Sequence, residues 1–448
     1  MLKGDLTLLT AVQAAEAIRD GRLSSEALVA ACLKKIEATD SDLKAWAHLD
    51  PDRALARARE MDRVRRAGLA VGPLQGLPVA LKDIVDTRDY PTECGAAAFA
   101  GRRPDRDAAI VERLTEAGAV ILGKTKTTEF AFVHPTDTVN PHDPMRSPGG
   151  SSSGSAAAVA AGHVPLAVGS QTGGSVIRPA SYCGLFGFKP SRGMISRRGV
   201  LQTSASLDHI GVFARTLEDA ALLTDALVSY DPADPASPPH ARPRTLAGAR
   251  ADVPVEPDLA WFDFPFNEML DEDARAGIDA VIDALGARVE RLPVSDTLTG
   301  LVDVHLTIHE YEFCQHMAQV IDAHWDSLSP TLKPVIERGR AITRDRYEDA
   351  MAVKQSAEAF FERHFQDFDA IISPSATGEA PLRSSGSTGD PVFCRIWSLC
   401  GLPSLTMPVL VGENGLPIGV QVIGSMEKDD RLFRTAAWVQ KSLAAEAA

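Results

Sequence analysis

The segment from residue 147 to residue 193 constrains the fold of this 448-residue chain more than any other part of its sequence. It reads SPGGSSSGSAAAVAAGHVPLAVGSQTGGSVIRPASYCGLFGFKPSRG, so two clusters of glycine and serine flank an alanine-rich helix and the short apolar run VPLAV. Glycines beside a serine let a ligand approach the backbone closely and leave N–H groups free to face an anion. Each cluster taken alone is also typical of an ordinary glycine turn, so the surrounding sequence has to decide between the two.

Helical and strand patterns alternate around this segment, which predicts an α/β fold. The alternation is clearest over a core of about 70–230, where LPVALKDI and AVILGK are typical of strands. Helical patterns dominate an insertion at about 300–367, and the late strands SLTMPVLV and PIGVQVIG return to the sheet. We therefore predict one large domain over residues 1–448 rather than two domains.

The overall charge and composition exclude several classes of protein. Lysine and arginine number 46 against 60 acidic residues, and the net charge of −14 opposes nonspecific binding to nucleic acid or to an anionic membrane. No apolar run reaches the roughly 20 residues of a membrane span. The six scattered cysteines contain no CxxC pair and suggest reduced thiols. These features predict a cytoplasmic protein with no nucleic-acid partner and no membrane partner.

Two matches to short catalytic motifs lack the structural context that their chemistry needs. Residues 118–125 (GAVILGKT) fit the phosphate-loop expression GxxxxGK[ST], but the four central residues are typical of a buried strand, not of a loop that cradles phosphates. Residues 150–154 (GSSSG) fit the GxSxG nucleophile elbow, yet the proline-rich NPHDPMRSPG precedes them where a hydrophobic strand should be. A P-loop nucleotide-binding protein therefore stays only as an alternative of another class.

A pair of histidines is the third candidate feature. His305 and His309 are four residues apart in VHLTIHEYEFCQH, so they could share one helix face, as zinc ligands do. The string lacks HExxH, because Phe313 stands where the second histidine of that motif belongs. We therefore predict no metal site and expect these side chains on a surface or on the wall of a pocket.

The glycine-serine clusters become informative when they are considered together with the lysine segment GLPVALKD. This segment, the cluster GGSSSGS and the loop GGS follow one another in the order and spacing of the amidase signature family, which the chain resembles over nearly its whole length. Ser151 lies 69 residues after Lys82, and Ser175 lies 24 residues after Ser151. GKTKTTEFAF, CGLFGFKPSRG and GLPIGVQVIG are further family-like strings. The resemblance implies a central mixed β-sheet with helices on both faces.

In this family the catalytic unit is Ser–cis-Ser–Lys, and the matching motifs place it on Ser175, Ser151 and Lys82, with a cis peptide between Gly150 and Ser151. A serine hydroxyl needs a base, and a lysine becomes one when burial lowers its pKa toward neutrality. The apolar run before Lys82 suits such burial, and Asp83 should point to the opposite face of the strand. The resemblance requires no metal and no organic cofactor.

The loop that carries the nucleophile is expected to bind the substrate. By resemblance, its backbone N–H groups form an oxyanion hole that comprises Thr172, Gly173, Gly174 and Ser175. Gly150 and Gln171 are expected to contact the substrate as well. Many members of the family have aspartate where this chain has Gln171, four residues before the nucleophile.

A second departure concerns arginine. Many members, including the amidase subunits of tRNA-dependent amidotransferases, have arginine two residues after the nucleophile, where this chain has Ile177 and then Arg178. The sequence SVIRP is similar to that of malonamidase-like bacterial amidases, in which this arginine faces the substrate. A guanidinium matches a carboxylate with two parallel hydrogen bonds, so we expect Arg178 to bind an acidic amide. The alternative is that Arg178 pairs with an internal acid such as Asp208.

The function predicted from the sequence is that of an amidase acting on linear amides. It would cleave the C–N bond of a small amide, with a carboxylate-bearing amide as the favoured variant, to a carboxylate plus ammonia or an amine through an acyl-enzyme. The predicted partner is this small-molecule amide alone, and a homodimer is a possible oligomeric state. The alternative within catalysis is the amidase subunit of a tRNA-dependent amidotransferase.

Overall fold

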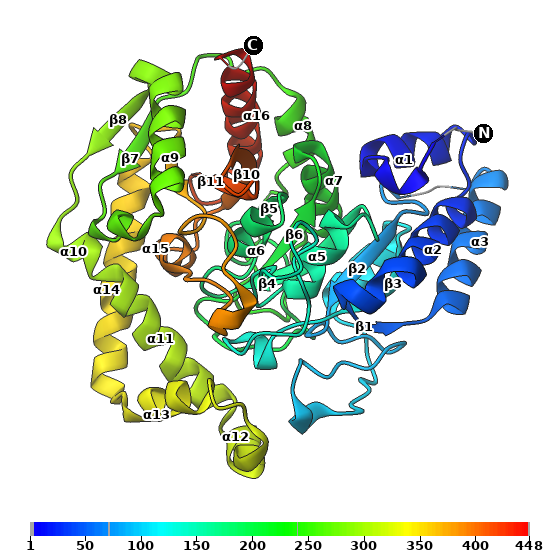
Figure 1. The fold of residues 1–448 in the computed structure, drawn as a ribbon, viewed down its shortest axis with the longest axis horizontal. Helices are drawn as coiled ribbons and strands as arrows, with labels where there is room; N and C mark the ends of the chain where they lie inside the picture. Colours follow the sequence, from blue (N-terminus) through cyan, green and yellow to red (C-terminus); the bar gives the residue numbers. More distant parts are fainter. Residues whose placement is uncertain (1–3, 70–71, 240, 447–448) are drawn as a thin grey trace.

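One mixed sheet of 11 strands forms the centre of the computed structural model, which describes residues 4–69, 72–239 and 241–446 (Figure 1). The strands are β1 (Trp46–Leu49), β2 (Pro78–Lys82), β3 (Val120–Thr125), β4 (Leu166–Gln171), β5 (Phe186–Lys189), β6 (His209–Ala214), β7 (Leu259–Phe262), β8 (Val289–Leu292), β9 (Ala370–Pro374), β10 (Ser404–Val411) and β11 (Pro417–Ile423). Their order is β1-β3-β2-β4-β6-β5-β10-β11-β9-β7-β8. The late strands β10 and β11 lie in the middle, so the end of the chain joins the two halves of the sheet.

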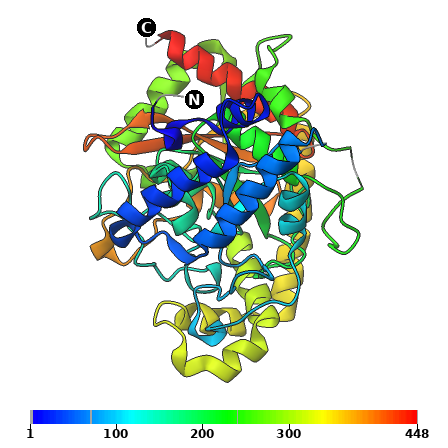
Figure 2. The ribbon, with the colours of Figure 1, turned by 90° about the vertical axis from the view of Figure 1, so that its right-hand side faces the viewer.

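Helices flank the sheet and complete the single domain. They are α1 (Ala11–Arg19), α2 (Ser25–Leu43), α3 (Pro51–Arg66), α4 (Ala109–Glu116), α5 (Ser153–Ala160), α6 (Ile177–Tyr182), α7 (Leu217–Leu227), α8 (Thr245–Arg250), α9 (Glu272–Leu285), α10 (Asp296–Thr299), α11 (Leu301–His316), α12 (Ala318–His324), α13 (Lys333–Ala341), α14 (Arg344–His364), α15 (Val392–Leu399) and α16 (Asp429–Glu446). Helices α11 to α14 gather at one end of the molecule, which is at the bottom of Figure 2.

The pairing of β2 positions the candidate site. All five residues of β2 are buried, as expected for a strand that has parallel neighbours, β3 and β4, on both sides. Because parallel strands end at the same edge of a sheet, Lys82 at the end of β2 lies close to the residues that follow the middle of β4. Strand β4 then leads directly into the loop that carries Ser175.

The structure confirms the α/β fold with a mixed sheet and reveals strands that the sequence did not indicate. Residues 120–125 form β3, so the phosphate-loop match is a buried strand as predicted. Strand β1, at the edge of the sheet, was missed because its four residues lie within sequence of helical character. No helix in the described part of the chain is long and apolar enough to cross a membrane.

Candidate active site

Lys82 and Ser151 meet in the interior beside the end of β2. Lys82 Nζ donates hydrogen bonds of 2.8 Å to Ser151 Oγ and of 2.8 Å to Ser170 Oγ. Both Lys82 and Ser151 are buried, and the peptide between Gly150 and Ser151 is cis. The partners of this ammonium group are therefore two neutral hydroxyls rather than a carboxylate.

The surroundings of Lys82 disfavour its charged form. Burial lowers the pKa of Lys82 to about 7, and the attraction of Asp208 only partly opposes this effect. Asp83 Oδ1 lies 3.0 Å from Lys124 Nζ on the neighbouring strand, so Asp83 forms an ion pair with Lys124 and not with Lys82. A substantial fraction of Lys82 is consequently neutral near pH 7 and able to accept a proton.

Three consecutive backbone carbonyls of the loop after β4 are hydrogen-bonded away from the site. Thr172 O accepts a hydrogen bond from His305 Nε2 at 2.8 Å, and Gly173 O accepts one from Ser398 Oγ at 2.8 Å. Gly174 O accepts one from the backbone N–H of Arg178 at 3.0 Å.

In a trans peptide the N–H points opposite to the C=O. The N–H groups of residues 173, 174 and 175 therefore point away from the side chains and backbone groups that bind the three carbonyls. None of these three N–H groups donates a hydrogen bond to another described residue. The close packing of the loop needs glycine at position 174, because a Cβ there would lie 2.8 Å from Pro391 Cβ. The arrangement is suited to stabilising an oxyanion.

Ser175 is half-buried and faces a cavity of about 130 Å³. Thr172, Gly173, Gly174 and Arg178 line the same cavity. No hydrogen bond joins Ser175 Oγ to Ser151 Oγ among the described residues, which is common before a substrate is bound. The structure therefore brings all four oxyanion-hole candidates to one cavity, with Lys82 and Ser151 buried outside its lining.

Arg178 is buried and makes hydrogen bonds with backbone carbonyls instead of with a carboxylate. Its Nε donates to Thr388 O at 2.8 Å, and its Nη2 donates to Gly150 O at 2.6 Å. Its Nη1 is buried without a hydrogen-bond partner. Asp208 is bound by Thr172 and by residues 203 and 204, so the expected alternative of an Arg178–Asp208 pair is absent from the described structure.

Gln171 and Gly150 lie outside the lining of this cavity. The Gln171 side chain accepts hydrogen bonds from the backbone N–H groups of Val176 and Ile177 at 2.9 and 3.0 Å and donates one to Ser398 Oγ at 3.0 Å. Gln171 therefore stabilises the loop from outside the cavity, and its side-chain hydrogen bonds are made with other residues of the protein. The carbonyl of Gly150 is likewise taken by Arg178.

Three residues near the loop have roles that the sequence did not indicate. Ser170 binds Lys82, and Ser398 binds Gly173 O. The sequence predicted His305 on a surface or on the wall of a pocket, but its Nε2 donates to Thr172 O and its Nδ1 accepts a hydrogen bond from Arg395 at 3.3 Å. Because a carbonyl only accepts and an arginine only donates, these contacts define a neutral His305 with its proton on Nε2.

The other histidine of the pair, His309, lines the cavity and stacks on Phe132. Elsewhere in the described structure, His48, Asp83 and Glu93 have ligand atoms within 4.8 Å of one another. Lys124 already compensates the charge of Asp83 there, so this group is not a persuasive metal site.

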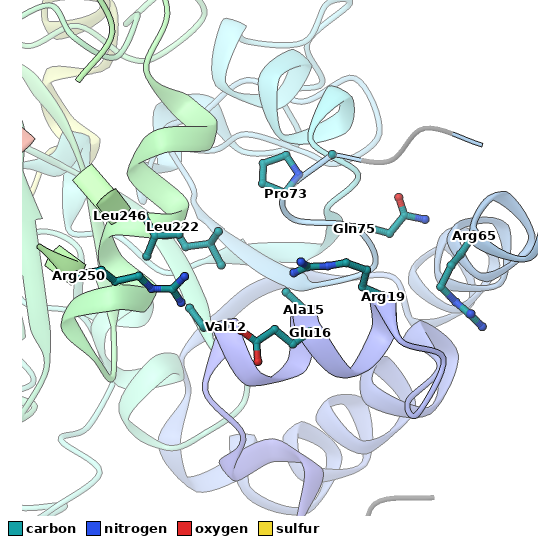
Figure 3. A pocket seen from close by; sticks show the side chains of 11 residues that line it. Val12, Ala15, Glu16, Arg19, Arg65, Pro73, Gln75, Leu222, Leu246 and Arg250 are labelled. Atoms are coloured by element: carbon teal, nitrogen blue, oxygen red, sulfur yellow. The ribbon is translucent and has the colours of Figure 1, made fainter. Parts of the chain in front are cut away.

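A larger cavity of about 440 Å³ lies between α1, α3, α7 and α8 (Figure 3). Its lining includes Val12, Arg19, Leu222 and Arg250, but none of Lys82, Ser151 and Ser175. We therefore assign the candidate active site to the smaller cavity in front of Ser175.

The chain is similar over nearly its whole length to several known proteins. The family model described as Amidase matches residues 27–433. A glutamyl-tRNA(Gln) amidotransferase subunit from Chloroflexus aurantiacus is 33% identical over 98% of this chain and 97% of its own length. A structure described as a vestigial protein complex that reveals the evolutionary origins of an s-triazine catabolic enzyme has a TM-score of 0.91 at 30% identity, covering 97% of this chain and 98% of its own. The structure of 6-aminohexanoate cyclic dimer hydrolase with its substrate has a TM-score of 0.86 at 27% identity, covering 98% of both chains.

These relatives correct the expected partners. The name of the Chloroflexus protein describes one subunit of an enzyme that acts on a tRNA, so the prediction of a small-molecule amide as sole partner, without nucleic acid, is wrong. The net charge of −14 misled this prediction because it sums the whole chain. A sum cannot report a local surface, nor a nucleic acid that is held by another subunit.

Proposed function

The chain belongs to the amidase family, and we propose that it is the amidase subunit of an amidotransferase, which cleaves a C–N amide bond and supplies the ammonia to a second substrate. The observation that carries the chemistry is the hydrogen bond between Lys82 and Ser151, in a site where burial makes the lysine a base near pH 7. The subunit role is supported by relatives named as glutamyl-tRNA(Gln) amidotransferase subunits, which match almost the full chain.

Acylation begins when Ser175 Oγ attacks the amide carbon. The Ser175 proton passes to Ser151 Oγ as Ser151 gives its own proton to neutral Lys82 Nζ, which becomes an ammonium. The carbonyl oxygen takes up the negative charge facing the N–H groups of residues 173–175, and one such donor is typically worth about 3 kcal/mol in the transition state.

The tetrahedral intermediate then expels ammonia. The proton returns from Lys82 through Ser151 to the leaving nitrogen, the C–N bond breaks, and the acyl group stays on Ser175 as an ester. Water attacks this ester while one of its protons passes through Ser151 to Lys82. That proton returns through Ser151 to Ser175 Oγ as the ester bond breaks, and the second proton of water is lost to the solvent when the acid leaves as a carboxylate.

Arg178 is proposed to hold the site together. Its side chain donates hydrogen bonds both to Gly150 O, next to Ser151, and to Thr388 O, and its backbone N–H donates to Gly174 O. Its unpartnered Nη1 is the one part of the guanidinium left for a substrate.

A free-standing hydrolase is the second candidate. It is favoured by the structural likeness to 6-aminohexanoate cyclic dimer hydrolase, which covers 98% of this chain. Affinity purification of the chain from its native cells distinguishes the two candidates. Partner subunits in stoichiometric amount support the amidotransferase, whereas an isolated chain that turns over an amide at full rate supports the hydrolase.

The shared chemistry is tested by a fluorophosphonate, which labels activated serines. We expect one adduct on Ser175 and none in Ser175→Ala, whose thermal unfolding should match wild type because the lost hydroxyl faces a cavity. An adduct on another serine, with Ser175 unmodified, would show that the nucleophile is misassigned.

A further inference from the structure

Three arginines line the cavity in front of Ser175, and they differ in whether a carboxylate balances their charge. Arg338 donates to both carboxylate oxygens of Glu310, at 3.2 and 2.5 Å, so these two charges cancel at the rim. Arg178 donates hydrogen bonds from its Nε and Nη2 to backbone carbonyls. Arg395, on α15, lines the same cavity and has no ion pair among the described residues. The cavity thus has a cation that makes no direct ion pair with a described carboxylate, and this cation lines the same cavity as the nucleophile.

Arg395 uses little of its hydrogen-bonding capacity within the protein. Its one hydrogen bond to a described side chain runs from Nη1 to His305 Nδ1. Two acids favour the charge of Arg395 without a direct contact. Asp390 is exposed and accepts a hydrogen bond from the backbone N–H of Val392, and Glu310 is paired with Arg338. Burial lowers the pKa of Arg395 to about 10, so the guanidinium is charged at neutral pH yet poorly hydrated. Such a group gains most from an anionic ligand.

Resting on the proposed function, we propose that Arg395 is an anion subsite that receives a carboxylate of the amide substrate while Ser175 attacks the amide group. The guanidinium is half-buried, faces the nucleophile's cavity and keeps donors free for a planar two-oxygen partner. This assignment moves the expected carboxylate contact from Arg178, whose donors are largely occupied, to Arg395.

The hydrogen bonds of His305 connect this subsite to the oxyanion loop. Arg395 donates to His305 Nδ1, and His305 Nε2 donates to Thr172 O, the carbonyl whose peptide carries the Gly173 N–H. A carboxylate on Arg395 would therefore lie at a fixed position relative to the N–H groups that face the reacting carbonyl. With a cavity of only about 130 Å³, this selects an amide whose carboxylate is a few carbons from the scissile bond.

Direct binding of glutarate tests the subsite without requiring turnover, because hydrolysis of an acidic amide yields a dicarboxylate. Titration calorimetry compares wild type with Arg395→Gln, which keeps a donor for His305 but loses the charge, and with Arg395→Lys, which restores a charge. We expect Arg395→Gln to weaken glutarate binding at least about tenfold, and Arg395→Lys to recover most of that loss. Arg346→Gln is the matched control, since this exposed arginine on α14 lies outside the cavity and should change binding by less than about twofold.

Three outcomes overturn the subsite: wild type that does not bind glutarate, unchanged binding in Arg395→Gln, or equal losses in Arg395→Gln and Arg346→Gln. Thermal unfolding of each variant confirms the fold, and Arg395→Lys decides the matter if Arg395→Gln does not fold. Fluorophosphonate labelling separates this test from that of the proposed function. Glutarate binding that depends on Arg395 without labelling of Ser175 would refute the amidase chemistry alone.

Discussion

Two lysines on adjacent parallel strands have opposite environments although both are completely buried. Lys82 ends β2 and Lys124 lies on β3, where it pairs in register with Leu81. Lys124 Nζ lies 3.0 Å from a carboxylate oxygen of Asp83 and donates to Thr92 Oγ1 at 2.8 Å. Lys82 has two serine hydroxyls and no carboxylate.

The difference shows how neighbouring strands can hold a structural ion and a base. Burial lowers the pKa of both lysines, but the carboxylate of Asp83 opposes the effect at Lys124 and favours its cation. At Lys82 the more distant Asp208 opposes burial only in part, and the pKa is lowered to about 7. Because residues 82 and 83 point to opposite faces of the strand, the acid serves Lys124 and leaves Lys82 free.

The largest expected effect comes from removing the base. Lys82→Met should slow fluorophosphonate labelling of Ser175 by about a thousandfold, since general-base catalysis typically contributes 10²–10⁴-fold. Its thermal stability should equal or exceed that of wild type, because methionine fills a similar volume without a desolvated charge. Labelling at a tenth of the wild-type rate or faster would mean that the serine proton goes elsewhere.

The same substitution at Lys124 should have the opposite signature. Lys124→Met leaves the Asp83 carboxylate buried and unpaired, at an expected cost of about 3–5 kcal/mol in the free energy of unfolding. Labelling of the molecules that remain folded should stay within about threefold of wild type. Urea denaturation measures the loss, and adding Asp83→Asn should recover most of it. Equal stability of Lys124→Met and wild type would remove the contrast between the two lysines.

The pH dependence of labelling gives a third contrast. Neutral Lys82 is the reactive form, so the rate should rise about tenfold per pH unit up to a pH of about 7 and then level off. Lys189 also has its pKa lowered to about 7 by burial, but its hydrogen bonds go to the carbonyls of Leu402 and Pro190. Lys189→Met should therefore keep the midpoint, and a midpoint that vanishes in this variant would reassign the titration.

The same pKa affects stability with a definite sign. The folded-state pKa of Lys82 lies below its unfolded value of 10.5, so between pH 7 and 10.5 the unfolded chain binds one proton more. The free energy of unfolding should consequently rise with pH over this interval, and more steeply in wild type than in Lys82→Met. Lys189 is present in both proteins, so the difference between the two curves isolates Lys82.

How much of the site the sequence could predict depends on how far apart in the chain the contacting residues lie. Lys82, Ser151 and Ser175 are assigned from local strings that resemble those of the amidase signature family, and such strings are short enough to be recognised without knowing the fold. Ser398 and His305, by contrast, reach the loop from 225 and 133 residues away in the chain. Such contacts depend on the order of strands in the sheet, which periodicity alone does not specify.

The interpretation of Gln171 and Arg178 shows the same limit within a short segment. Their spacing from Ser175 predicts that both lie near the substrate, and the structure does put both beside the loop. Whether a side chain faces the cavity or the protein depends on the partners behind it, which are Ser398 for Gln171 and Thr388 for Arg178. Both partners belong to the C-terminal part of the chain, so the orientation could not be derived from the segment itself.

The smallest expected effect concerns Ser170, the second hydroxyl on Lys82. Ser170→Ala removes one acceptor from the ammonium, and a hydrogen bond of this kind contributes about 1 kcal/mol, so labelling should slow no more than about tenfold. Because the lost acceptor favours the charged form, the pKa of Lys82 should fall further and the midpoint should move to lower pH. Ser155→Ala is the matched control, since this buried serine of α5 binds Val168 O and Thr125 but not Lys82. It should leave both the rate and the midpoint unchanged. A midpoint that moves to higher pH in Ser170→Ala, or that moves equally in both variants, would show that hydroxyl contacts do not set the proton affinity of Lys82.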